Sequence, residues 1–511
     1  MTLLIYSWLI IIFISLISIC FQFSINFFLR RYIELVHCFA ITFAYLMFVG
    51  LSTILLPRYI SALLLTSPIF VAYIGKLKFS VADFSSGDSL KTKMREYLPA
   101  FLTWFLIVAI AASLTSIQIL DKSQLPDGPY VYKKWSVPVE NQWAAGDMPT
   151  DNSLPYFTGE FLVRGVNLEE VHPIMPGQEI INRTFGVSFI YLAFRQLGGF
   201  TTNEIKIPTF NYMATDWPDA TVLYSTNSYK VFNAVSLVTN GFLVFVLVYV
   251  LSRIRTKNKS MVPPAILIGV FPFFVHQTFY TWTKSFCLAF TVLAIHFFLK
   301  SRYLTSGLYL ALSYQVHPMA LIFIVALILF DLVNSRRLRS SLILPPVTSI
   351  GIWLLWTRTT NLNPDLIQQN LFSNQSLVDH FFARINSLGL FLNPGILSLY
   401  PFNLRNFINA WNISGMILAL LFGLWLVISQ KNLMQRSVYE NSFFQISLVS
   451  LVCSIFVFSK PVPVQFFGGQ LLIIFVLIFV LSRVRTRFDF MAFLMISVIP
   501  LCFWVYGLST L

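Results

Sequence analysis

The chain has 511 residues, of which 57% are hydrophobic and only 11% are charged, and its mean hydropathy is +0.73. This composition excludes an ordinary soluble protein. The formal net charge of +14 would suit nucleic acid, but the basic residues lie at the ends of apolar segments, so we expect no nucleic-acid partner. The five cysteines lie inside apolar segments without metal-site spacing.

Apolar segments long enough to cross a bilayer recur along the chain and predict an all-α polytopic membrane protein with about 12–14 transmembrane helices. The segments cover residues 3–29, 36–56, 59–75, 98–119, 230–252, 261–280, 284–300, 304–316, 318–333, 341–357, 411–429, 442–459, 464–482 and 489–509. The first lacks a basic flank and a cleavage site, so we expect it to be retained as a span. The two short segments around His317 could instead form a hairpin that does not fully cross.

The charges of the links between these segments predict the topology. One alternating set of links holds 21 of the 35 Lys and Arg but 7 of the 21 Asp and Glu, and the rest of the chain holds 14 of each. Basic links remain preferentially in the cytoplasm. We therefore expect a multi-pass protein of the inner cell membrane, with both termini and the loop 120–229 on the external side.

The loop after the fourth span is the most acidic part of the chain. Residues 121–230 hold 12 of the 21 carboxylates and 8 of the 35 Lys and Arg, so we expect the chemistry there. Within it, residues 185–197 are apolar but too short for a span and predict an interfacial helix. A second external segment, 358–410, could cover the loop as a lid. The predicted organisation is N-terminal helices with a cytoplasmic loop at 1–97, a core at 98–360, an external segment at 361–410 and C-terminal helices at 411–511.

Carboxylates in this loop are the candidate catalytic groups. Asp127 lies in the turn Pro-Asp-Gly-Pro-Tyr, where it could accept a proton from a sugar hydroxyl or simply form the turn. Asp147 and Asp151, with Asn152 and Tyr156, could bind sugar hydroxyls, or they could form a loop of Asx turns. Such an all-oxygen set would suit Mg²⁺ or Mn²⁺, but we predict neither a metal site nor another cofactor.

Three cationic or titratable side chains are candidates for binding a phosphate. Arg183 could clamp a phosphate bidentately or anchor its helix among lipid headgroups. Lys284, at the outer end of a span, could pair with a lipid-linked phosphate or be a snorkelling lysine. His317 lies between two short helices and could contact a phosphate, or it could be a buried, hydrogen-bonded histidine.

Taken together, these motifs resemble the C-type membrane glycosyltransferases, a superfamily that uses polyprenyl-phosphate-linked sugars. The similarity covers about residues 98–360 and is carried by the segments PDGPY, GDMPTDNSLPY, NRT and YTWTKSF. The chain departs from the family pattern in one respect. Many members carry a pair of adjacent acids after the first helix of the fold, whereas here Asp121 precedes Lys122 and Asp127 stands alone.

The resemblance implies an inverting transfer of a hexose or pentose from a polyprenyl-phosphate carrier to an envelope glycan, lipid or protein. The base would be Asp127, or else Asp151 or Asp147. Arg183, Lys284 and His317 would hold the departing phosphate. Lipid-linked sugar and membrane lipids would be the partners.

Other functions remain open at this stage. A transporter or flippase for lipid-linked glycans predicts ionisable groups within the spans and an internal repeat. A polysaccharide polymerase or ligase predicts a large external loop near the C-terminal end of the chain, with arginines as its main functional residues. A scaffold of an envelope-assembly complex would need no catalytic group. The sequence gives no indication of oligomeric state.

Overall fold

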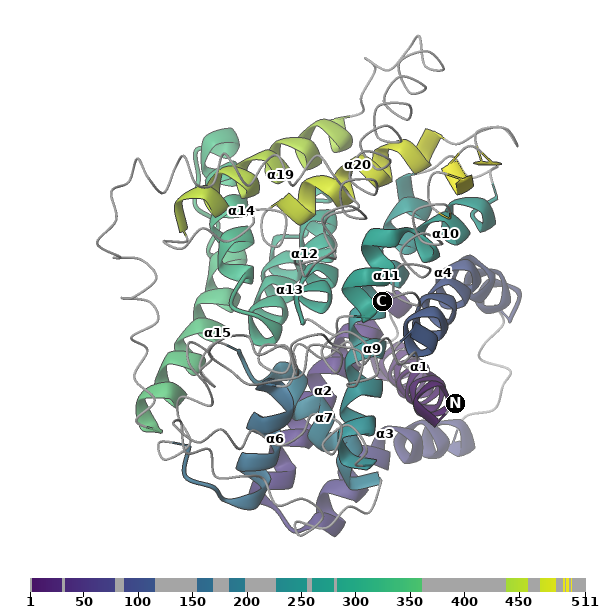
Figure 1. The fold of residues 1–511 in the computed structure, drawn as a ribbon, viewed down its shortest axis with the longest axis vertical. Coiled ribbons are helices and arrows are strands. Elements are labelled where there is room, and N and C mark those ends of the chain that lie inside the picture. Colours follow the sequence, from purple (N-terminus) through teal and green to yellow (C-terminus); the bar gives the residue numbers. More distant parts are fainter. Residues whose placement is uncertain are drawn as a thin grey trace, which may run out of the picture. The chain divides into compact units, whose positions relative to one another are not determined.

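The computed structural model describes residues 2–29, 33–78, 87–114, 154–168, 183–197, 227–254, 260–279, 283–360, 438–457, 469–483 and a few positions between 490 and 498. These residues are almost entirely helical, and they contain no β-strand (Figure 1). The chain divides into two compact units. Unit 1 comprises Met1–Phe242, Thr278–Ser285 and Thr360–Leu362, and unit 2 comprises Leu243–Gln277, Phe286–Thr359 and Asn363–Leu511.

Unit 1 contains the first helices and the described part of the acidic loop 120–229. Its helices are α1 (Thr2–Leu29), α2 (Leu35–Leu55), α3 (Arg58–Lys78), α4 (Gly87–Leu114), α6 (Leu154–Arg164), α7 (Gly186–Leu197) and the first half of α9 (Asn227–Ile254). Helix α2 packs along both α1 and α7, and α6 packs on α7.

Unit 2 contains the second half of α9 and the helices that follow. These are α10 (Val262–Gly269), α11 (Pro272–Phe279), α12 (Lys284–Leu299), α13 (Tyr303–Val316), α14 (Ala320–Ser335), α15 (Ser340–Thr359), α19 (Val438–Val457) and α20 (Gly469–Arg483). The last two residues of α11 and the first two of α12 belong to unit 1, which includes Thr278–Ser285. Helix α13 packs along α15, and α19 packs on both α14 and α20.

Five of the described helices are long and apolar enough to cross a membrane. They cover Thr2–Asn26, Leu35–Leu55, Glu96–Leu114, Asn227–Ile254 and Ser340–Thr359. The expected all-α membrane protein is thereby confirmed, whereas the expected count of 12–14 spans stays a prediction. The segment 411–429 and most of 489–509 lie outside the described residues.

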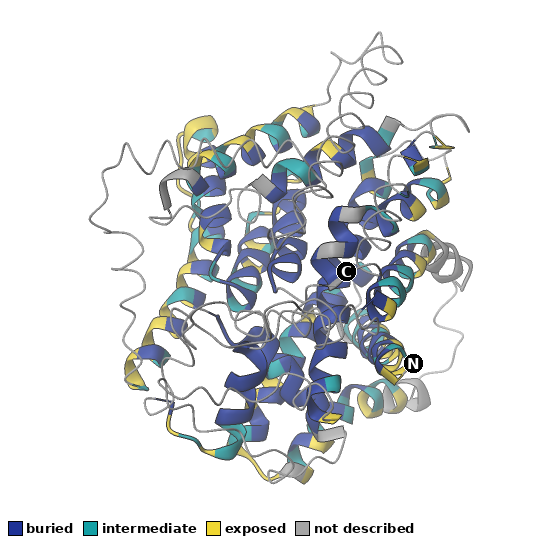
Figure 2. Cartoon of the chain, viewed as in Figure 1, coloured by how far each residue is buried: buried dark blue, intermediate teal, exposed yellow. Residues whose placement is uncertain are grey.

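The burial pattern fits an apolar solvent around the protein. On α1, the exposed side chains Ile5, Leu9, Ile12, Leu16 and Ile19 recur every three or four residues and form one apolar stripe. Figure 2 shows exposed and buried parts on the same described helices. Helix α9 is instead buried without interruption over residues 231–251. Cys20, Cys38 and Cys287 are also buried, and Cys453 is half-buried; all four are free thiols.

One expected span is interrupted. Residues 261–280 were expected to form a continuous segment, but the structure has two eight-residue helices, α10 and α11, with the break at Val270 and Phe271. Pro272 is the first residue of α11. Proline has no backbone N–H and disfavours helical geometry in the residue before it, so it begins a helix more readily than it continues one.

Two close helix contacts position the loop helices within unit 1. The indole Nε1 of Trp104 on α4 donates a hydrogen bond to the carbonyl of Val238 on α9, at 2.9 Å. Gly50 on α2 lies so near α7 that a Cβ at this position would be 1.8 Å from the carbonyl oxygen of Phe189. Only a glycine permits this approach, so residue 50 fixes the distance between α2 and α7.

Candidate functional site

The predicted catalytic carboxylates are not among the described residues. Asp127, Asp147, Asp151 and Asn152 all lie in the part of the loop between α4 and α6 that the structure does not describe. Their roles as base or as sugar ligands therefore stay predictions. Among the described residues, no group of three His, Cys, Asp or Glu side chains could hold a metal ion.

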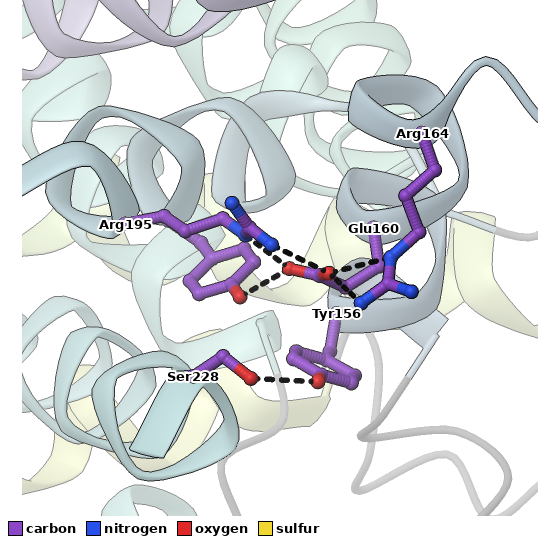
Figure 3. Close-up of polar contacts among 6 residues, drawn as sticks. Tyr156, Glu160, Arg164, Arg195 and Ser228 are labelled. Atoms are coloured by element: carbon purple, nitrogen blue, oxygen red, sulfur yellow. Dashed lines mark hydrogen bonds and ion pairs between the residues drawn. The ribbon is translucent and has the colours of Figure 1, made fainter. Parts of the chain in front are cut away.

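A buried ionic cluster joins the two loop helices, and the sequence analysis did not anticipate it. Glu160 on α6 is fully buried, and its Oε1 accepts hydrogen bonds from the Tyr191 hydroxyl and from Arg195 Nε, both at 2.6 Å (Figure 3). Its Oε2 accepts from Arg195 Nη2 and from Arg164 Nε, each at 3.1 Å. Arg164 Nη2 also lies 3.1 Å from Oε2. One carboxylate thus holds two guanidinium groups and a phenol.

The surroundings of this cluster shift the pKa values of Tyr191 and Arg195. Burial raises the pKa of Tyr191 well above its usual value, and the adjacent charge of Glu160 raises it further. Burial alone would lower the pKa of Arg195, but its hydrogen bonds to Glu160 and the charge of that carboxylate raise it. The phenol stays neutral and the guanidinium stays charged. Because its oxygens are occupied by these donors, Glu160 is a structural anion and not a general base.

Tyr156 was predicted as a sugar ligand, and it lies in α6 rather than in an open loop. Its side chain is fully buried, and its hydroxyl is 3.1 Å from the hydroxyl of Ser228 at the start of α9 (Figure 3). Its ring makes edge or tilted contacts with the rings of Tyr191, Tyr229 and Phe232. These contacts join α6, α7 and α9 through an aromatic core.

Arg183 lies in a bend three residues before α7 begins, and its side chain is only 9% exposed. The next residue, Thr184, is also buried, and its hydroxyl oxygen has no hydrogen-bond partner among the described residues. The N-terminus of a helix carries a partial positive charge. Arg183 therefore adds a cation to an end of α7 that already favours anions.

A second buried cation lies at the N-terminus of α12. Lys284 is the first residue of this 16-residue helix and is only 6% exposed. On either side of it, Thr283 and Ser285 are buried as well, and neither hydroxyl has a hydrogen-bond partner in the part of the chain that the structure describes. We call Thr283–Ser285 the α12 turn. It combines a buried charge, two hydroxyl groups and the positive end of a helix.

His317 terminates α13 and belongs to unit 2. Its backbone is extended, with φ −159° and ψ 134°, as expected for a residue that precedes a proline. The imidazole Nδ1 accepts a hydrogen bond from the backbone N–H of Met319 at 2.9 Å. In this arrangement the ring is not doubly protonated, and it caps the first turn toward α14.

No protein-family model, curated protein or solved structure matches the chain.

The described candidate residues divide between the two units. Tyr156, Arg183 and Lys284 all belong to unit 1, whereas His317 belongs to unit 2. The sequence analysis missed Glu160 and its partners because it treated residues 120–229 as a loop with a helix only at 185–197 and did not predict α6. A signal was present: Glu160 and Arg164 are four residues apart, as are Tyr191 and Arg195, which is the spacing of neighbours on one helix face.

Proposed function

We propose that the protein is a membrane glycosyltransferase that moves a sugar from a polyprenyl-phosphate carrier to an acceptor hydroxyl at the external face, with inversion. The observation that carries this proposal is the α12 turn. Lys284 is buried there between two hydroxyl groups that have no partner among the described residues. Such a group of donors suits an oxyanion.

The electrostatics of the α12 turn favour an anion over water or a neutral group. A lysine at the first position of a helix adds its charge to the positive end of the helix dipole. An anion at this position interacts favourably with the ammonium, with the helix end and with the hydroxyl donors. A snorkelling lysine keeps its ammonium in water, whereas Lys284 is nearly inaccessible.

The α12 turn has the properties that departure of a phosphate requires. When the bond between the anomeric carbon and the phosphate oxygen breaks, both electrons remain on the phosphate, and its negative charge increases. Lys284, together with Thr283 and Ser285, would stabilise that charge in the transition state. Arg183, which is also buried in unit 1, is the second candidate for this role.

The acceptor side of the reaction needs a base in the external loop. The acceptor hydroxyl forms the new bond to the anomeric carbon from the face opposite the phosphate, and its proton passes to a carboxylate. Asp127, Asp151 or Asp147 would take this proton. Glu160 is unsuited to it because arginine and tyrosine donors already occupy both of its oxygens.

The test is transfer of radiolabelled sugar from polyprenyl-phosphate donors by the purified protein, with Lys284→Gln compared with the wild type. Loss of a donor that stabilises a developing oxyanion lowers kcat by about 10²–10³-fold. Lys300→Gln is the matched control, because Lys300 is an exposed lysine that follows the other end of the same helix. We expect it to leave the rate unchanged.

Two outcomes would contradict the proposal. The phosphate site would be rejected if Lys284→Gln transferred sugar as fast as Lys300→Gln. Movement of the lipid-linked sugar across the membrane without formation of a glycosidic bond would favour a flippase instead.

A further inference from the structure

A stripe of buried polar side chains runs along α9, in the part of this helix that belongs to unit 1. Asn233, Ser236 and Asn240 are each at most 2% exposed. They are spaced by three and four residues, so successive rotations of about 100° place them on one face of the helix. We call these three residues the α9 stripe.

The polar atoms of the α9 stripe have no partners among the described residues. The side-chain nitrogen of Asn233, the hydroxyl of Ser236 and both amide atoms of Asn240 make no hydrogen bond there. Thr239 behaves differently on the same helix. Its hydroxyl bonds to the backbone carbonyls of Val235 and Ser236, at 2.9 and 3.1 Å. The stripe is therefore not satisfied by its own helix, although a hydroxyl nearby is.

The α9 stripe also does not face the helix on which α9 is anchored. Val238 and Phe242 lie on the opposite side of α9, because rotation by about 100° per residue separates them from the stripe by roughly half a turn. There, Trp104 of α4 bonds to the carbonyl of Val238 and packs edge-on against the ring of Phe242. The aromatic contacts with α4 thus involve one face of α9, and the α9 stripe takes no part in them.

Buried amides without partners are unfavourable, and they are more so within a membrane, where water does not replace a lost hydrogen bond. Two such amides and one hydroxyl on the same helix face indicate a polar binding partner. Amide and hydroxyl groups offer both donors and acceptors but no net charge. This combination complements the hydroxyl groups of a saccharide, which also donate and accept, better than it complements an ion or a lipid tail.

We propose that the α9 stripe binds saccharide hydroxyls, and that it holds the sugar of the donor whose phosphate lies at the α12 turn. The identification of that sugar as the donor's rests on the proposed function, whereas the saccharide binding itself does not. Both elements belong to unit 1. In this arrangement a charged group recognises the constant part of the donor, and a neutral stripe recognises the variable part.

The experiment compares the thermal stability of the full-length protein in lipid nanodiscs, because glycoside detergents are themselves saccharide ligands. The probes are polyprenyl phosphate, its hexose-bearing and pentose-bearing forms, and the corresponding free sugars. In the wild type, we expect at least one sugar-bearing lipid to raise the melting temperature more than polyprenyl phosphate does. Asn233→Leu and Asn240→Leu should abolish this extra rise and retain the effect of polyprenyl phosphate.

Two further variants control for folding and for the helix. Ser236→Ala is a milder change in the α9 stripe and should reduce the extra rise. Thr239→Val removes a hydroxyl that is already satisfied within α9 and should leave the extra rise intact. The unliganded Asn240→Leu variant should melt no lower than the wild type, because neither amide atom of Asn240 has a hydrogen-bond partner among the described residues and leucine has a similar size.

The outcomes separate this inference from the proposed function. If both Leu variants kept the extra rise, or if neither a sugar-bearing lipid nor a free sugar gave one in the wild type, saccharide binding at the stripe would be refuted. If the stripe proved necessary for the rise but no sugar were transferred, the inference would stand and the transferase proposal would fail. If transfer proceeded normally in both Leu variants, only the inference would be lost.

Discussion

Replacing Glu160 by glutamine should be among the most damaging single changes in unit 1. Four hydrogen bonds converge on the carboxylate, two on each oxygen. A glutamine NH₂ group at the Oε1 position would face Arg195 Nε, and at the Oε2 position it would face N–H groups of both Arg195 and Arg164. Neither amide orientation avoids placing donor against donor, and the buried guanidinium of Arg195 loses its counter-charge.

The expected cost is about 3–5 kcal/mol, the range for removal of one partner from a buried ion pair. It would be measured as the change in the free energy of unfolding of the purified protein in bicelles. Asp331→Asn is the matched control. Asp331 is also a buried carboxylate, but its partner Arg339 is 29% exposed, so that variant should cost only about 1 kcal/mol.

A compensating pair tests the cause of the effect. Glu160→Leu combined with Arg195→Met removes the fully buried pair and keeps the volume, so it should recover part of the lost stability, while Arg164, at 12% exposure, loses its carboxylate partner. If Glu160→Gln cost no more than Asp331→Asn, the view that this cluster holds α6 against α7 would be refuted.

Three further predictions concern packing, pH and helix capping. Gly50→Ala places a methyl group against the backbone of Phe189 and should destabilise the protein by about 1–3 kcal/mol, whereas Gly351→Ala, with nothing within 4 Å of the added atom, should be neutral or slightly stabilising in the same unfolding assay. Since the fold raises the pKa of Tyr191, the stabilisation that its neutral phenol contributes should be complete below about pH 10 and be lost as the pH rises further. Unfolding of the wild type and of Tyr191→Phe at alkaline pH should reveal this loss, and identical pH profiles would contradict it. His317→Ala should cost about 1 kcal/mol by removing a cap on a backbone N–H, and an unchanged unfolding free energy would exclude the capping role.

The helices were predictable from the sequence because long apolar runs in a membrane protein have few alternatives to a helix. The expected segment at 3–29 became α1 (Thr2–Leu29), and the short helix expected at 185–197 was confirmed as α7 (Gly186–Leu197). The interruption at Phe271 was missed. Hydropathy is continuous there, and only the following proline signals the break.

The candidate site was predicted less completely, for a physical reason. Arg183 and Lys284 were recognisable because a charge next to an apolar helix is conspicuous. Glu160 was not, since its burial depends on Arg195, 35 residues away, and sequence spacing does not reveal which charges pair across a loop. The polar residues of α9 were not recognised either, because the mean hydropathy of the helix is high despite three polar positions on one face.

The free cysteines have a practical consequence. Cys20, Cys38 and Cys287 are enclosed by protein, so hydrophilic thiol reagents added to whole cells should find little to modify at these native positions. With Cys453 and Cys502 replaced, a single cysteine engineered in place of Asp127 or Asp151 would be the main thiol that these reagents modify. The sidedness of the acidic loop can therefore be mapped while these three native thiols stay in place.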